Sequence, residues 1–104
     1  MPYELLLDDI RALVAAPITG ERKRFLDDLE RTLTDGYAHA LALESQRLQL
    51  ERRRGELLGN GQIGEQTQEL TALTTRIADA DERLGELRGL LDSLRRRASE
   101  LRAA

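Results

Sequence analysis

The chain of 104 residues has a formal net charge of -3 and a pI of about 5.2, which argues against nucleic acid as a partner because nucleic-acid-binding domains are usually basic. It contains no cysteine, which excludes disulfides, thiolate metal sites and cysteine nucleophiles. Aromatic residues make up only 3% of the chain, so the core has to be built mainly from aliphatic side chains. Heavy use of Leu, Ala, Glu and Arg is typical of long helices, and we expect a single domain over residues 1–104.

The N-terminal residues do not have the pattern of a signal peptide. Glu4, Asp8 and Asp9 interrupt the apolar residues, and no basic segment precedes them. No stretch approaches the roughly 18 apolar residues that a membrane span needs. We therefore expect a cytoplasmic protein without a membrane span. Lys23 is the only lysine among many arginines, which indicates a bacterial source.

The first predicted element is a short helix within residues 1–17. Leu6 and Ile10 belong to an apolar stripe at helical spacing. The helix is expected to end before Pro17, because the residue before a proline avoids the α region. Thr19 is a candidate N-cap for the helix that follows.

A long helix is predicted for residues 20–58, followed by a turn at 59–64 and a second long helix at 65–103. The turn contains three glycines and one asparagine, and Gly59 suits the left-handed position that closes a helix. Each long helix carries a seam of residues at alternating steps of three and four, which predicts a left-handed coiled coil. The seam of the first helix consists of Leu26, Leu29, Leu33, Gly36, Ala40, Leu43, Arg47, Leu50, Arg54 and Leu57. The seam of the second consists of Leu70, Leu73, Ile77, Ala80, Leu84, Leu87, Leu91, Leu94, Ala98 and Leu101.

Two long helices joined by a short turn run antiparallel. The predicted fold is therefore all-α, with a short N-terminal helix followed by a long antiparallel two-helix coiled-coil hairpin. In one register Gly36 faces Leu84 and Ala40 faces Ala80. A register shifted by one heptad is also consistent with the sequence.

The seam leaves apolar residues such as Tyr37, Leu41 and Leu48 without cover. Either the N-terminal helix folds back over the base of the hairpin, near Phe25 and Leu90, or two hairpins pair into a four-helix bundle. Small helical domains often need oligomerisation for stability, so self-association is expected.

The sequence contains no pattern that predicts catalysis, a cofactor or a metal. His39, the only histidine, lies in a helical stretch of small residues without an evident catalytic partner. The acidic groups at 8–9, 27–28 and 79–82 diverge around helix faces, whereas a divalent cation needs oxygens that converge on one point. We therefore expect that the protein is not an enzyme and has no cofactor or metal site.

Basic runs occur at 21–24, 51–54 and 95–102, and acidic residues such as Glu51 and Glu100 interrupt them. Phosphate binding needs cations on one face without interleaved acids. Nucleic-acid contact through these Arg-rich faces is therefore the weaker of two functional hypotheses.

Candidate partner-binding residues lie where charged residues interrupt the apolar seam. Arg47 and Arg54 interrupt the seam of the first long helix, and Leu48 remains uncovered beside them. An arginine can lay its stem along a seam and place its guanidinium at the edge. Glu65 and Glu69 are near enough in register to neutralise Arg54.

Gly85 and Gly89 are a second candidate surface. They lie one helical turn apart, and each costs about 1 kcal/mol relative to Ala in the middle of a helix. Two small residues at this spacing let another helix approach closely, either the N-terminal helix or a partner helix. The predicted partner-binding residues are therefore Arg47, Leu48, Arg54, Gly85 and Gly89.

These features predict a helical-hairpin protein that acts in protein–protein interaction or self-assembly, as an adaptor, a chaperone-like protein or a regulatory subunit. The expected partner is a second copy, forming a dimer of hairpins, or another helical protein. The alternative is a transcription-associated or nucleic-acid-contacting coiled-coil regulator that uses its Arg-rich faces.

Overall fold

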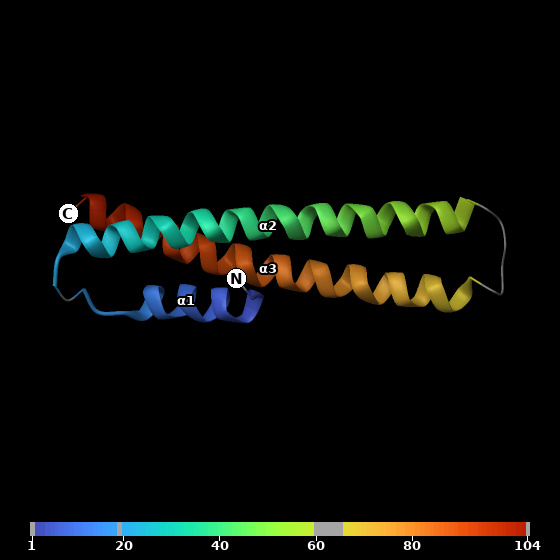
Figure 1. Ribbon diagram of the computed structural model, residues 1–104, viewed down its shortest axis with the longest axis horizontal. Coiled ribbons are helices and arrows are strands. Elements are labelled where there is room, and N and C mark those ends of the chain that lie inside the picture. Colours follow the sequence, from blue (N-terminus) through green and yellow to red (C-terminus); the bar gives the residue numbers. More distant parts are fainter. Residues whose placement is uncertain (1, 19, 60–65, 104) are drawn as a thin grey trace. The chain divides into compact units, whose positions relative to one another are not determined.

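The computed structural model describes residues 2–18, 20–59 and 66–103, and almost all of them are helical. Helix α1 spans Tyr3–Ala15, α2 spans Arg22–Gly59 and α3 spans Thr67–Ala103 (Figure 1). Within the described ranges there is no strand, and α2 and α3 pack against each other as a hairpin. The predicted fold class, a short helix followed by a long two-helix hairpin, is confirmed.

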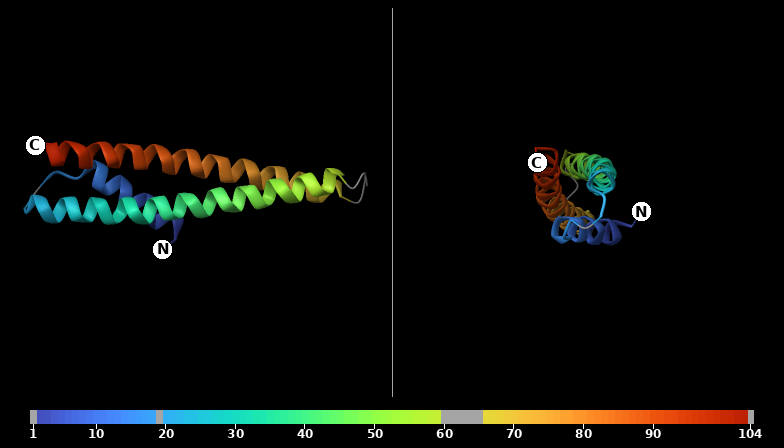
Figure 2. Two further views of the ribbon diagram at one scale, coloured as in Figure 1. Left: turned by 90° about the horizontal axis from the view of Figure 1, so that it is seen from above. Right: turned by 90° about the vertical axis from the view of Figure 1, so that its left-hand side faces the viewer.

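The chain divides into two compact units. The three-helix unit comprises Met1–Ala40 and Glu86–Ala104, so it holds α1, the first part of α2 and the last part of α3. The two-helix unit, Leu41–Gly85, holds the remaining parts of α2 and α3. Within each unit the segments of α2 and α3 run in opposite directions (Figures 1 and 2).

The connection between α1 and α2 follows from a proline and a glycine. Ala16 has left the helix for an extended conformation, with ψ 137°, because Pro17 excludes α geometry from the residue before it. Gly20 adopts a φ of +83°, a backbone conformation that would be strained for a residue with a side chain. The chain then turns back into α2, whose direction is opposite to that of α1 (Figure 1).

In the three-helix unit, α1 packs on one side of the helix pair. Its Leu6 and Ile10 are fully buried, and the ring of Tyr3 lies 5.5 Å from the ring of His39 on α2. Folding back of the N-terminal helix was one of the two solutions that the uncovered apolar residues predict, and this unit adopts it.

Gly36 shows the register of the helix pair in this unit. A Cβ added at Gly36 would lie 2.3 Å from Cδ2 of Leu91, so Gly36 faces Leu91. The register in which Gly36 faces Leu84 is wrong, and the structure adopts the alternative shifted by one heptad. Counting along the two helices from this contact places Ala40 opposite Leu87.

Side-chain volume explains the shift. In the rejected register Ala40 would face Ala80, and the space between two small side chains would lack packing contacts. In the adopted register Ala40 faces the larger Leu87, and Gly36 accommodates Leu91. The seam is thus filled by setting small residues against large ones.

The two-helix unit has a smaller apolar cluster. Leu50, Leu57, Leu73 and Ile77 are buried together, and Leu70 packs against them. The shifted register sets Leu50 against Ile77, so the cluster agrees with the contact at Gly36. Of the described helices, only α2 and α3 contribute residues to this unit.

The prediction that Gly59 lies just beyond the helix in a left-handed conformation is wrong. Gly59 is the last residue of α2, and Gly20 is the only glycine with positive φ in the described part of the chain. Glycine adopts right-handed helical geometry as well as left-handed geometry. A glycine therefore does not by itself end the helix at the residue before it, and α2 ends at Gly59 and not at residue 58. The proposed N-cap Thr19 and most of the predicted turn, residues 60–64, lie outside the described residues.

None of the helices in the described ranges combines the length and the apolar character that a membrane span requires.

Candidate functional site

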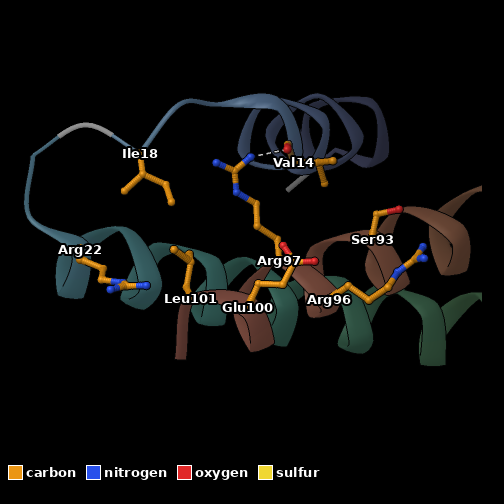
Figure 3. A pocket seen from close by; sticks show the side chains of 8 residues that line it. All are labelled: Val14, Ile18, Arg22, Ser93, Arg96, Arg97, Glu100 and Leu101. Atoms are coloured by element: carbon orange, nitrogen blue, oxygen red, sulfur yellow. Dashed lines mark hydrogen bonds between the residues drawn. The ribbon is translucent and has the colours of Figure 1, made fainter. Parts of the chain in front are cut away.

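A cavity of about 510 Å³ opens in the three-helix unit, near the end of α1, the start of α2 and the last turns of α3 (Figure 3). Apolar side chains and charged side chains share its wall. The lining residues are Val14, Ile18, Arg22, Ser93, Arg96, Arg97, Glu100 and Leu101.

Arg97 connects α3 to the end of α1 across this cavity (Figure 3). Its guanidinium donates hydrogen bonds to the backbone carbonyl oxygens of Val14 and Ala16 and lies 5.1 Å from the centroid of the Phe25 ring. The last carbonyl groups of a helix lack intrahelical partners and carry the negative end of the helix dipole. The positive charge and the N–H donors of Arg97 meet both of these needs, so Arg97 fastens the end of α1 to α3.

The cavity does not bring together a catalytic set of groups. Ser93 supplies the only hydroxyl among the described residues that line it, and this hydroxyl donates to the carbonyl oxygen of Gly89 one turn earlier. The hydroxyl is thus bonded to the backbone and not to Glu100, the carboxylate in the same lining, and a hydroxyl that is not activated by a general base is a weak nucleophile. In the part of the chain that the structure describes, no group of three or more His, Cys, Asp or Glu side chains could hold a metal ion.

Arg47 lies in the seam of the two-helix unit, where the register sets it opposite the small Ala80. Its Nη1 donates to Oδ1 of Asp81 at 2.7 Å. Its Nε lies 3.7 Å from Oε1 of Glu51, too far for a hydrogen bond, and is buried without a hydrogen-bond partner. The hydrogen bond with Asp81 and the charge of Asp81 raise the pKa of Arg47 above its ordinary value. The guanidinium therefore remains charged, and it reaches the edge of the seam.

Arg54 is half-buried, and among the described residues it forms no ion pair. The prediction that Glu69 neutralises Arg54 is wrong, and Glu65, the other predicted partner, lies outside the described residues. Oε1 of Glu69 instead accepts a hydrogen bond from Nε of Arg53 at 3.0 Å, because Arg53 lies at the edge of the seam whereas Arg54 points into it. This hydrogen bond is the main cause that raises the pKa of Arg53.

A row of exposed residues runs along α2 within the two-helix unit. Leu41 and Leu48 are exposed to 67% and 49%, and Gly55 continues the row at the same spacing of seven residues. Glu44 and Arg52 lie on the same side of the helix, because residues three, four and seven apart share a face. We call this surface, formed by Leu41, Glu44, Leu48, Arg52 and Gly55, the α2 flank. Apolar side chains that are exposed together often mark an interaction site.

The two glycines of α3 have no close neighbours. A Cβ added at Gly85 or at Gly89 would meet nothing within 4 Å. The prediction that α1 docks against them is therefore wrong, and α1 is held instead by contacts such as those of Arg97. Their use by a partner helix stays a prediction.

Arg47, Leu48 and Arg54 are predicted from the sequence as one surface, and the structure separates them: Leu48 lies on the exposed α2 flank, whereas Arg47 and Arg54 belong to the seam. The cavity and the role of Arg97 are not predicted, since Arg97 stands out in the sequence only as part of a basic run. A signal was present, because Arg97 follows Leu90 by seven residues and so shares its side of α3.

No family model, curated protein or solved structure matches this chain, so the inference of its function rests on the chain's own surfaces.

Proposed function

We propose that the protein is a non-enzymatic helical interaction module, which binds a second copy of itself or another helical protein through the α2 flank. The observation that carries this proposal is the exposure of Leu41 and Leu48, at 67% and 49%, on one side of a long helix. Burying a leucine side chain contributes about 1.5–3 kcal/mol, and a partner helix supplies that burial without any change in the seam.

The alternative, a regulator that contacts nucleic acid through its Arg-rich faces, has weaker support. Arg11, Arg47, Arg53 and Arg102 each pair with a carboxylate on a neighbouring helix. These guanidinium groups would have to give up their partners before they could neutralise phosphates. A salt titration of DNA binding separates the hypotheses, since binding that persists at physiological salt and weakens steeply with added salt favours the alternative.

A photo-cross-linking residue at position 48, introduced in the cells that make the protein, tests the proposal. The matched control is position 46, because Gln46 is exposed on the same helix but lines a polar hollow with Arg76 and Arg83. We expect discrete covalent protein adducts from position 48 and none from position 46. The absence of adducts at position 48, or equal adducts at both positions, would contradict the proposal.

A further inference from the structure

We infer that the α2 flank pairs with the α2 flank of a second copy, with the two helices antiparallel and the twofold axis passing beside Leu48. This inference rests on the proposed function, because it names the partner of the same surface. It commits to one geometry, in which each contact residue is fixed by its distance from Leu48 along the helix.

A twofold axis makes the contact isologous, so each residue meets the one that lies equally far on the other side of the axis. Leu41 lies seven residues before Leu48, and Gly55 lies seven residues after it. Leu41 of each copy therefore faces Gly55 of the other. By the same rule Glu44, which lies four residues before Leu48, faces Arg52 of the second copy, which lies four residues after Leu48.

Side-chain volume supports this pairing. Gly55 lies inside α2, where a glycine costs about 1 kcal/mol relative to Ala, and a Cβ added there would meet nothing within 4 Å. The glycine thus has no packing use within its own chain. In the proposed pair it receives Leu41 of the second copy, as Gly36 receives Leu91 inside the hairpin.

Charge supports the antiparallel direction. The α2 flank carries Glu44 on one side of Leu48 and Arg52 on the other. Antiparallel pairing sets Glu44 of each copy against Arg52 of the other, whereas parallel pairing would set like charges against each other, which is unfavourable. Glu44 also attracts Arg47 within its own chain, and a carboxylate has enough lone pairs to serve two donors.

Single cysteines test the geometry, because the chain has none of its own. Under mild oxidation we expect Leu48→Cys to form a disulfide-linked dimer, since the axis brings the two introduced side chains within bonding distance. Leu41→Cys alone and Gly55→Cys alone should not link, because the two copies of either residue lie about 21 Å apart at 1.5 Å per residue. An equimolar mixture of these two variants should link into a mixed dimer.

The control is Gln46→Cys, which carries an exposed thiol on the other side of the same helix. Because a specific pair holds its thiols at a high effective concentration, we expect roughly ten-fold more linked dimer from Leu48→Cys than from this control. Circular dichroism verifies that each variant remains helical. Equal linking at all positions would show random collision and overturn the inference.

Failure of the inference differs from failure of the proposed function. If Leu48→Cys does not link, but a photo-cross-linker at position 48 captures a different protein, the self-pairing is overturned and the proposed function stands. If neither experiment gives an adduct at position 48, both are overturned. Linking of Leu48→Cys together with the mixed dimer of Leu41→Cys and Gly55→Cys supports both.

Discussion

The same heptad position has a different character in the two units. It is the position directly before the first seam residue of each heptad. In the three-helix unit its residues are half-buried, and they are Phe25, Thr32, His39, Leu90 and Arg97. In the two-helix unit its residues are all exposed, and they are Gln46, Arg53, Glu69, Arg76 and Arg83. The composition of this position therefore changes with burial: in the three-helix unit it includes the apolar Phe25 and Leu90, and in the two-helix unit all of its residues are polar or charged.

This difference shows how to interpret an uncovered helix face. Exposure alone does not mark a binding surface, because the uncovered face with Arg53 and Arg76 is already suited to water. The α2 flank is different, since it is uncovered and still carries Leu41 and Leu48. This combination of exposure and apolar character is what supports our proposal that the α2 flank is an interaction surface.

The largest effect should come from cavities in the two seams. Leu94 in the three-helix unit is 0% exposed and Leu50 in the two-helix unit is 9% exposed. We expect Leu94→Ala to lower the free energy of unfolding by about 4 kcal/mol and Leu50→Ala by about 2 kcal/mol. Urea denaturation followed by circular dichroism measures both. Equal losses would remove the energetic difference between the units.

The next effect concerns the attachment of α1. Arg97→Gln should lower the free energy of unfolding by about 2 kcal/mol, because charge-assisted hydrogen bonds to the end of α1 are lost. Hydrogen exchange should also become faster for amides of α1. Arg96→Gln is the matched control, since Arg96 lines the same cavity but is exposed. If both variants behave alike, Arg97 does not fasten the helix.

Two glycine substitutions should have opposite signs. Gly36→Ala should lower stability by about 1 kcal/mol, because a Cβ placed 2.3 Å from the buried Leu91 overpacks the seam and outweighs the better helix propensity of Ala. Gly85→Ala should raise stability by about 1 kcal/mol, since its Cβ would meet nothing. Thermal melts of both variants test the close packing at Gly36. Stabilisation by Gly36→Ala would argue against the contact with Leu91.

The smallest effect should come from the charged seam residues. Arg47→Leu together with Arg54→Leu should raise the melting temperature by completing the apolar seam and removing the buried Nε of Arg47 that lacks a hydrogen-bond partner. Calorimetry measures the change, with Gln46→Leu as a control at an exposed position of the same helix outside the α2 flank. A lower melting temperature for the double variant would mean that the pair between Arg47 and Asp81 stabilises the unit more than apolar packing would.

Periodicity predicts most of this fold. Apolar residues at alternating steps of three and four predict both long helices, and Pro17 predicts the end of the short helix α1. Spacing alone does not choose between two registers that differ by one heptad. The choice follows from volume at Ala40, which faces the small Ala80 in one register and the larger Leu87 in the other, whereas Gly36 faces a leucine in both. This test can be applied to a sequence.

The candidate site could be predicted only in part. Leu48 is evident as an apolar residue off the seam, and its exposure follows from the absence of a covering helix. Arg97 could not be identified from composition, because its function depends on where the carbonyl groups of Val14 and Ala16 lie in space. Its spacing of seven residues from Leu90 indicates which side of α3 it occupies, but the hydrogen bonds to residues so far away in sequence leave no local pattern.

The molar mass in solution, measured by light scattering over a range of concentrations, tests most directly the claim that the α2 flank pairs with itself. We expect the wild-type mass to rise from 11.7 kDa toward twice that value as concentration increases. The double variant Leu41→Gln with Leu48→Gln should remain at 11.7 kDa, because both substitutions are at exposed positions and spare the seam. A wild-type mass that stays at that of one chain at every concentration, or an equal rise in the double variant, would contradict the account.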